Sequence, residues 1–103
     1  MYSRVTLLEI DTLRITIPEA VAMFEERVLP QLREQEGYEG VVVLANPEGK
    51  AMLVSVWEDE EAATSSAGFA TGALEEFVAI FRAPPGRDHY EVVLAEMPDV
   101  VVS

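Results

Sequence analysis

One junction constrains the fold of this chain more than any other feature of its sequence. The apolar stretch Val54-Ser55-Val56-Trp57 is rich in β-branched residues and ends at the only tryptophan. The acidic run Glu58-Asp59-Glu60-Glu61 follows at once, which is typical of a strand that passes directly into a helix. Asp59 is a suitable N-cap for that helix. The junction therefore predicts a strand at 51–57 and a short helix near 60–67.

The other elements follow from apolar periodicity and turn residues. The first main helix should begin at a capping box formed by Thr16 and Glu19, kink at Pro30 and end at Gly37 in a left-handed conformation. The segment 46–49, Asn-Pro-Glu-Gly, suits a type I turn that joins two strands into a hairpin. The remaining elements are predicted as strands at 4–11, 40–46 and 89–96 and as a second main helix at 72–83. The order β-α-β-β-α-β predicts an α+β, ferredoxin-like fold with a four-stranded antiparallel sheet.

The composition is that of a single globular domain. The chain has 103 residues, half of them apolar, and we treat 1–103 as one domain with a core at 4–96 and a tail at 97–103. Cysteine is absent, and no apolar stretch approaches the roughly 20 residues of a membrane span, so we expect a cytoplasmic protein. The formal net charge of −12 makes nucleic acid and anionic membranes poor partners, because phosphate binding needs clustered Lys and Arg.

The strand sequences predict that both faces of the sheet are covered. An antiparallel sheet with one solvated face alternates apolar and polar residues, whereas several segments here are apolar on both faces. These segments are Val41–Ala45, Met52–Val54 and Val92–Leu94. One face would pack on the helices, and the other would need a second cover. We expect a homodimer in which a second copy covers this face. The alternative is a monomer whose C-terminal tail folds across the sheet.

Three segments of the chain resemble the antibiotic biosynthesis monooxygenase (ABM) domain family. They are Phe24–Leu32, Gly37–Gly40 and Val56–Ala62, and with the strand order the resemblance extends over residues 4–96. The resemblance implies a dimeric α/β barrel, in which two ferredoxin-like chains pair. It also implies a choice of functions, because the family includes cofactor-independent oxygenases of aromatic polyketides, haem-degrading enzymes and quinol oxygenases.

The same resemblance bears on haem. Haem-degrading members of the family carry a tryptophan that aligns with Trp57, an asparagine on the first strand and a histidine in the helical segment after the tryptophan. Here Ser3 or Arg4 stands at the asparagine position, and the segment Ala62–Leu74 contains no histidine. Two of the three haem-site residues are missing, so we predict no tight haem binding and no haem turnover, and we expect no cofactor.

The sequence offers candidates for a ligand pocket between sheet and helices, whereas it identifies no catalytic residue. The candidates are Phe24, Ser55, Trp57, Phe69 and Phe81. Trp57 could instead be a core aromatic residue, and Ser55 could simply bond to neighbouring backbone. The small-residue segment 67–73 could be a mobile lid with Phe69 as its plug, or a loose connector, because its two glycines lower helix stability.

His89, the only histidine, is expected at a solvated strand end. A single imidazole is a poor basis for a metal site, so we predict no metal.

Two functions remain open. The first, which the resemblance implies, is a cofactor-independent monooxygenase acting on an aromatic or quinol-type small molecule. The second is a non-enzymatic dimeric barrel that binds a small apolar ligand or acts as an interaction module.

Overall fold

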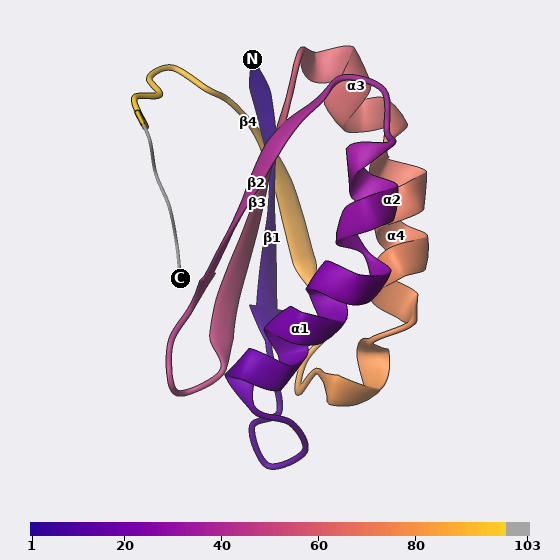
Figure 1. Ribbon diagram of the computed structural model, residues 1–103, viewed down its shortest axis with the longest axis vertical. Coiled ribbons are helices and arrows are strands. Elements are labelled where there is room, and N and C mark those ends of the chain that lie inside the picture. The colour runs from indigo at the N-terminus through magenta and orange to yellow at the C-terminus, as the bar shows by residue number, and fades with distance from the viewer. Residues whose placement is uncertain (99–103) are drawn as a thin grey trace.

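The computed structural model describes residues 1–98, which form an antiparallel sheet with a layer of helices on one of its faces (Figure 1). The elements follow in the order β1 (Tyr2–Glu9), α1 (Ile17–Arg27), α2 (Leu29–Arg33), β2 (Tyr38–Ala45), β3 (Lys50–Trp57), α3 (Glu60–Ser65), α4 (Ala67–Glu75), the 3₁₀ turn η1 (Val78–Ile80) and β4 (Gly86–Glu91). None of the helices within this range is long and apolar enough to cross a lipid bilayer.

The four strands form one sheet in the order β2-β3-β1-β4, and every neighbouring pair is antiparallel. This order confirms the predicted β-α-β-β-α-β ferredoxin-like fold. Paired residues of neighbouring strands share a face of the sheet. Arg4 of β1 is paired with Ser55 of β3 on one side and with His89 of β4 on the other. The register thus brings polar residues from three strands together beneath the helices.

Local capping and chain-breaking residues set the first part of the helix layer. Thr16 Oγ1 accepts a hydrogen bond from the Glu19 amide at 3.2 Å, and the Glu19 carboxylate accepts one from the Thr16 amide at 3.1 Å, which confirms the capping box. The helix breaks at Val28 into α1 and α2, because Pro30 has no N–H to donate to the preceding turn. Gly37 has the expected positive φ, +81°, but it lies in the turn before β2, and the helix itself ends earlier.

The hairpin and the N-cap that follow lie as predicted. The Gly49 amide donates to the Asn46 carbonyl at 3.1 Å, and a φ of +94° at Gly49 lets the chain turn back into β3. Asp59 caps α3, because its carboxylate accepts a 2.8 Å hydrogen bond from the amide of Ala62. The strand-to-helix junction therefore forms as its sequence indicates.

The second main helix lies earlier in the chain than the predicted range of 72–83, so that prediction is wrong. The segment 67–73, expected to be a lid or a loose connector, forms most of α4. Its alanines have the highest helix propensity and offset the two glycines. Arg87 also holds this helix to the sheet, through hydrogen bonds to Ala67 O at 3.3 Å and Thr71 Oγ1 at 2.8 Å. After α4 the helical conformation continues only as the short turn η1.

The last strand, β4, also starts and ends earlier than the predicted strand at 89–96. It ends where its partner begins, because Glu91 pairs with Tyr2, the first residue of β1. No residue of β1 remains for the following residues to pair with. The apolar residues Val93 and Leu94 are therefore outside the sheet and almost fully exposed.

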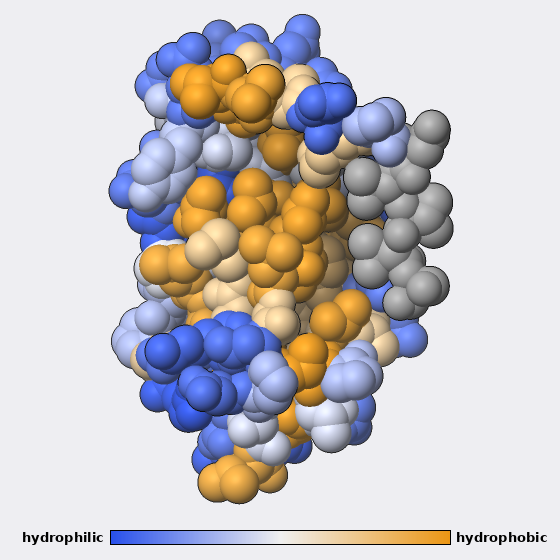
Figure 2. Space-filling view, turned by 90° about the vertical axis from the view of Figure 1, so that its left-hand side faces the viewer, coloured by the Kyte–Doolittle hydropathy of each residue, from blue (hydrophilic) through white to orange (hydrophobic). Residues whose placement is uncertain are grey.

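The face of the sheet away from the helices is apolar, and much of it is exposed. Figure 2 shows a hydrophobic patch at the centre of this face. Leu7 of β1 and Val42 and Leu44 of β2 are exposed there. This is the face that was expected to need a second cover. The tail that the monomer alternative places across this face includes residues 99–103, which lie outside the described residues.

Candidate functional site

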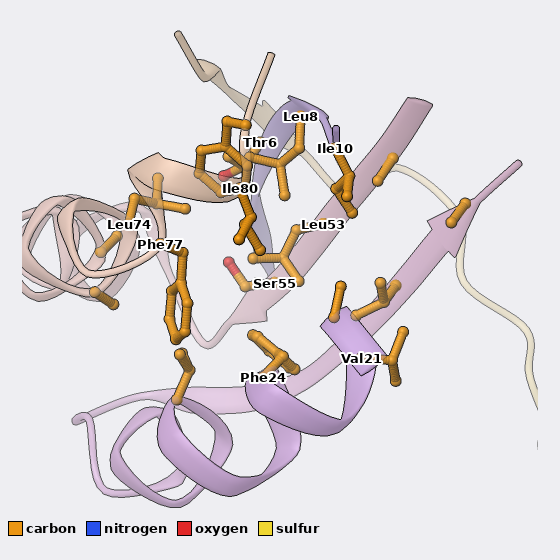
Figure 3. A pocket seen from close by; sticks show the side chains of 18 of the residues that line it. Thr6, Leu8, Ile10, Val21, Phe24, Leu53, Ser55, Leu74, Phe77 and Ile80 are labelled. Carbon is orange, nitrogen blue, oxygen red and sulfur yellow. The ribbon is translucent and has the colours of Figure 1, made fainter. Parts of the chain in front are cut away.

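A cavity of about 100 Å³ lies between the sheet and the helices. Strands β1, β2 and β3 form its floor, and α1, α4 and the residues around η1 form its walls (Figure 3). Its lining is mostly apolar and includes four phenylalanines, Phe24, Phe69, Phe77 and Phe81. Among the described residues, the polar side chains of the lining are those of Arg4, Thr6 and Ser55. All three come from the strands, so the polar groups are confined to the floor.

Four of the five pocket candidates identified in the sequence border this cavity. Phe24 comes from α1, Phe69 from α4, Phe81 from the segment after η1, and Ser55 from β3. Whether they bind a ligand stays a prediction. Phe77 lines the cavity too, although we did not identify it as a site residue. In the predicted helix 72–83 its spacing of four residues from Phe81 would place both side chains on one face, whereas in the structure the two residues flank η1.

Trp57 is not part of the lining, and of its two predicted roles the structure shows the core one. Its side chain is fully buried beneath Leu32 of α2 and Ala63 of α3. The indole Nε1 donates a 2.9 Å hydrogen bond to Ser55 Oγ. The ring also packs edge-on against Tyr38, with ring centroids 6.0 Å apart. Trp57 thus supports the cavity floor from outside the cavity, because the end of β3 lies under α2 and α3.

Ser55 lines the cavity and also bonds to neighbouring protein groups, and its contact with a ligand stays a prediction. It is buried on β3, and Figure 3 shows its side chain among the residues that surround the cavity. Its hydroxyl accepts the hydrogen bond from Trp57 and donates a long one, 3.4 Å, to the backbone carbonyl of Arg4. Ser55 therefore connects the core tryptophan with the cavity floor.

Arg4 also lines the cavity, although the sequence did not identify it as a pocket candidate. It lies on β1 and is only 3% exposed. Its Nη1 donates to Ala63 O at 2.9 Å and to Ser66 Oγ at 2.7 Å. Its guanidinium carbon lies 5.1 Å from the centroid of the Trp57 ring, which is a cation–π contact. The sequence does contain a signal for its place in the lining. Arg4, Thr6 and the apolar residues that follow at every second position lie on one face of a strand.

No carboxylate pairs with Arg4 within residues 1–98, where both ion pairs involve other arginines. Burial, and after it the positive charge of Arg87, lowers the pKa of the Arg4 guanidinium to about 10. That pKa is still well above neutral pH, so Arg4 remains charged. One end of the cavity floor therefore carries a positive charge without a counter-ion, in a chain whose formal net charge is −12.

His89 lies inside β4 and not at a solvated strand end as expected, because the strand begins three residues earlier, at Gly86. It is half-buried, and its Nε2 has no hydrogen-bond partner among the described residues. It stands opposite Arg4 in the sheet but does not line the cavity. No group of three His, Asp or Glu side chains in residues 1–98 is placed to hold a metal ion.

The cavity does not suit haem. None of the described lining residues is a histidine, cysteine, methionine or tyrosine, so the lining provides no usual axial ligand for haem iron. Its volume of about 100 Å³ is also below the roughly 300–1,000 Å³ of typical pockets for larger organic ligands. The residues present thus disagree with a haem site.

A groove on the outside of the helix layer lies next to the cavity. It runs between α1–α2 and α4 and is lined by Arg27, Val28, Gln31, Gly68, Phe69, Gly72, Ala73 and Glu76. Three of these residues, Val28, Phe69 and Ala73, line the cavity as well. They form the wall between the groove and the cavity, and Phe69 has the largest side chain of the three.

No protein-family model matches the chain, and no curated protein is significantly similar to it in sequence. Solved structures are similar in fold. A monooxygenase of Streptomyces coelicolor, in complex with the ligand nanaomycin D, matches with a TM-score of 0.70 and 17% identity, over 95% of this chain and 92% of that one. A protein of Nitrosomonas europaea named as an antibiotic biosynthesis monooxygenase matches with a TM-score of 0.71 and 13% identity, over 91% of this chain and 100% of that one.

This chain has the fold of the antibiotic biosynthesis monooxygenases. A heme degrader of Mycobacterium tuberculosis, with two hemes bound in its active site, is similar too. It matches with a TM-score of 0.68 and 19% identity, over 94% of this chain and 100% of that one. At these identities the likeness concerns the ABM fold, and the chemistry has to be argued from the residues of the cavity.

Proposed function

We propose that this protein is an oxidoreductase that binds an aromatic or quinol-type small molecule in its cavity and oxygenates it without a cofactor. The observation that carries the proposal is the cavity, with its four phenylalanines and its polar groups confined to the floor. Such a site favours a flat ring with one polar edge. The Streptomyces coelicolor monooxygenase of the same fold binds nanaomycin D, which supports a small-molecule substrate.

In the proposed reaction the ionised substrate itself supplies the electrons, so the protein needs few titrating groups. In an anthrone a ring CH₂ group becomes a carbonyl, and in a naphthoquinol a ring C–H becomes C–OH while the quinol becomes a quinone. In both cases one atom of O₂ enters the product, and the other leaves as water with two hydrogens of the substrate. The cavity would exclude bulk water and hold the ring in one orientation. Since about 100 Å³ is small for a polycyclic substrate, a larger ligand requires α1 and α4 to move apart.

One observation favours the second candidate function, a non-enzymatic barrel that binds a small apolar ligand. The described lining contains no histidine, carboxylate, lysine or tyrosine, and therefore no ordinary general base. Ionisation of the substrate would have to come from its own acidity and from the positive charge of Arg4. The binding of a ring in the cavity is common to both functions, and only oxygen consumption separates them.

Oxygen uptake with a panel of hydroxylated naphthoquinols and anthrones tests the proposal. We expect uptake above the spontaneous rate for at least one compound, together with saturable binding of that compound. Ala20→Phe fills the cavity from α1 and should abolish both, whereas Ala22→Phe, on the exposed side of the same helix, should change neither. Binding that is lost in Ala20→Phe without any oxygen uptake in the wild-type protein would support the non-enzymatic alternative. Uptake that survives Ala20→Phe would mean that the cavity is not the site.

We also propose that the protein works as a homodimer, with the cytoplasm as its compartment. The support for the dimer is the exposed apolar patch on the open sheet face (Figure 2). A patch of this kind is unusual on a monomer, and an identical face related by two-fold symmetry is the simplest cover for it. Pairing of these faces would leave the groove and the cavity on the opposite side accessible to ligand.

A further inference from the structure

The buried guanidinium of Arg4 is difficult to explain as a purely structural group. A charged side chain in a protein interior is costly unless it is paired with an opposite charge or fully hydrogen-bonded. Arg4 has no carboxylate partner within residues 1–98. A second cation, Arg87, lies close enough to lower its pKa. The surroundings therefore favour an anion at this point, and the described protein provides none.

The internal contacts of Arg4 also use only part of its donor capacity. A guanidinium has five N–H donors, and both hydrogen bonds of the Arg4 side chain come from Nη1. Nε and Nη2 have no acceptor among the described residues. Neither atom is completely buried, since Nε2 of His89 is the one completely buried side-chain nitrogen or oxygen without a partner in residues 1–98. These donors therefore keep some accessible surface, and Arg4 lines the cavity.

We propose that Arg4 binds an anionic oxygen of the ligand, with the hydroxyls of Thr6 and Ser55 beside it, while the apolar body of the ligand occupies the cavity. The ligand class is a small aromatic molecule that carries one ionised oxygen group, either a carboxylate or a phenolate. Both groups offer a negative oxygen to charged N–H donors, which gives shorter and stronger hydrogen bonds than a neutral acceptor. This inference rests on the proposed function in one respect, because it uses the same cavity.

The charge of the whole chain narrows the choice of ligand. A formal net charge of −12 repels anions at long range. Arg4 is 3% exposed and lies at the floor of an apolar cavity, so a small hydrated anion gains little by reaching it. Only an anion with an apolar body gains enough from burial to enter. The site should therefore select amphipathic monoanions over inorganic anions and acetate.

Binding of matched ligand pairs to the wild-type protein tests this inference. Each pair keeps one ring and differs in charge: benzoate against methyl benzoate, and 4-nitrophenolate against 4-nitroanisole. Affinity is measured by calorimetry, and the fluorescence of Trp57, whose ring contacts Arg4, reports the location of benzoate and its ester. We expect the ionised member of at least one pair to bind about 10-fold or more tightly, and acetate not to bind. The preferred pair distinguishes a carboxylate ligand from a phenolate ligand.

Variants of Arg4 assign the preference to this residue. Arg4→Met should remove the preference for the ionised member and leave the neutral member bound with similar affinity. Arg14→Met, which changes the charge equally on the exposed surface, should keep the wild-type preference. Because Arg4 also holds α3, circular dichroism establishes whether Arg4→Met folds. If it does not fold, Arg4→Lys, which keeps the charge but loses the guanidinium geometry, should weaken the ionised member selectively.

Three results would overturn the inference. Equal affinity within both pairs would refute the role of charge while leaving the cavity as a ligand site. An unchanged preference in a folded Arg4→Met variant, or in Arg4→Lys if the methionine variant does not fold, would move the anion contact away from Arg4. The absence of binding for all four compounds would refute both this inference and the proposed function.

Discussion

At the scale of single residues, the core and the cavity floor are joined by one series of contacts. Trp57 donates to Ser55, Ser55 donates to the backbone of Arg4, and the Arg4 side chain donates to Ala63 and Ser66 near the end of α3. Buried polar networks of this kind are most costly when one member is left without its partner. A substitution in the core should therefore also alter the cavity floor, although Trp57 does not line the cavity.

Replacement of Trp57 by alanine should lower the free energy of unfolding by about 3–5 kcal/mol, the usual range for a buried aromatic residue. The side chain is fully buried, and its loss removes the contact with Tyr38 and the hydrogen bond to Ser55. Denaturant titrations at equal protein concentration measure the change. Trp57→Phe, which keeps an aromatic ring, should lose clearly less. A loss of only about 1 kcal/mol for the alanine variant would contradict full packing of the ring.

At the scale of elements, capping residues and glycines decide where the chain turns. Gly49 has a φ of +94°, and a Cβ at this position would collide with the carbonyl of Ile10. Gly72 lies inside α4, and no other atom lies within 4 Å of the position that its Cβ would take. The first glycine is required by the hairpin, whereas the second only weakens a helix that forms one wall of the cavity.

Gly72→Ala should therefore stabilise the protein by about 0.5–1 kcal/mol, because alanine loses less backbone entropy than glycine in a helix. Gly49→Ala is the matched change and should destabilise the protein by at least about 1 kcal/mol, because alanine strongly disfavours a positive φ. Thermal unfolding of both variants under identical conditions measures the two shifts. Stabilisation by Gly49→Ala, or destabilisation by Gly72→Ala, would contradict this assignment of the two glycines.

At the scale of the whole molecule, the helices cover one face of the sheet and leave an apolar face on the other side (Figures 1 and 2). The two faces have different tasks in the proposed function. The covered face would bind the ligand in its cavity, and the open face would pair with a second copy. Because the two sites lie on opposite faces, their disruption can be measured separately.

Leu7→Glu should separate the proposed dimer into folded monomers. Leu7 is 54% exposed on the central strand β1, so a glutamate there is tolerated in a monomer but would be buried without a partner in a dimer. Light scattering should give twice the 11.4 kDa chain mass for the wild-type protein and the single chain mass for the variant. Leu13→Glu, at a 96% exposed loop position, should leave the mass unchanged. A folded wild-type monomer at micromolar concentration would refute the dimer.

Haem should not bind in stoichiometric amounts. The cavity lining offers no axial ligand among its described residues, and the segment after Trp57 contains no histidine. A titration of haem into the protein should therefore show no saturable shift of the Soret band. A saturable shift at submicromolar haem would show that this chain binds haem with a different set of residues.

The sequence by itself determined the features that depend on neighbours along the chain. The capping box at Thr16, the N-cap Asp59 and the turn at Gly49 each arise within a few residues, and the strand order followed from the pattern of such local elements. The predicted boundaries of the second main helix were wrong. The helix propensity of 67–73 is weakened by two glycines, and tertiary contacts such as those of Arg87 stabilise the helix there.

Only the tertiary structure decided the ends of β4 and the composition of the site. The last strand ends where β1 has no further residue to pair with it. The local sequence around Val93 and Leu94 cannot indicate this end. Arg4 became a cavity residue because pairing of distant strands set it between Ser55 and His89, with the end of α3 above it. Burial of a charge depends on what surrounds it in space, and those neighbours come from segments that are far apart in the chain.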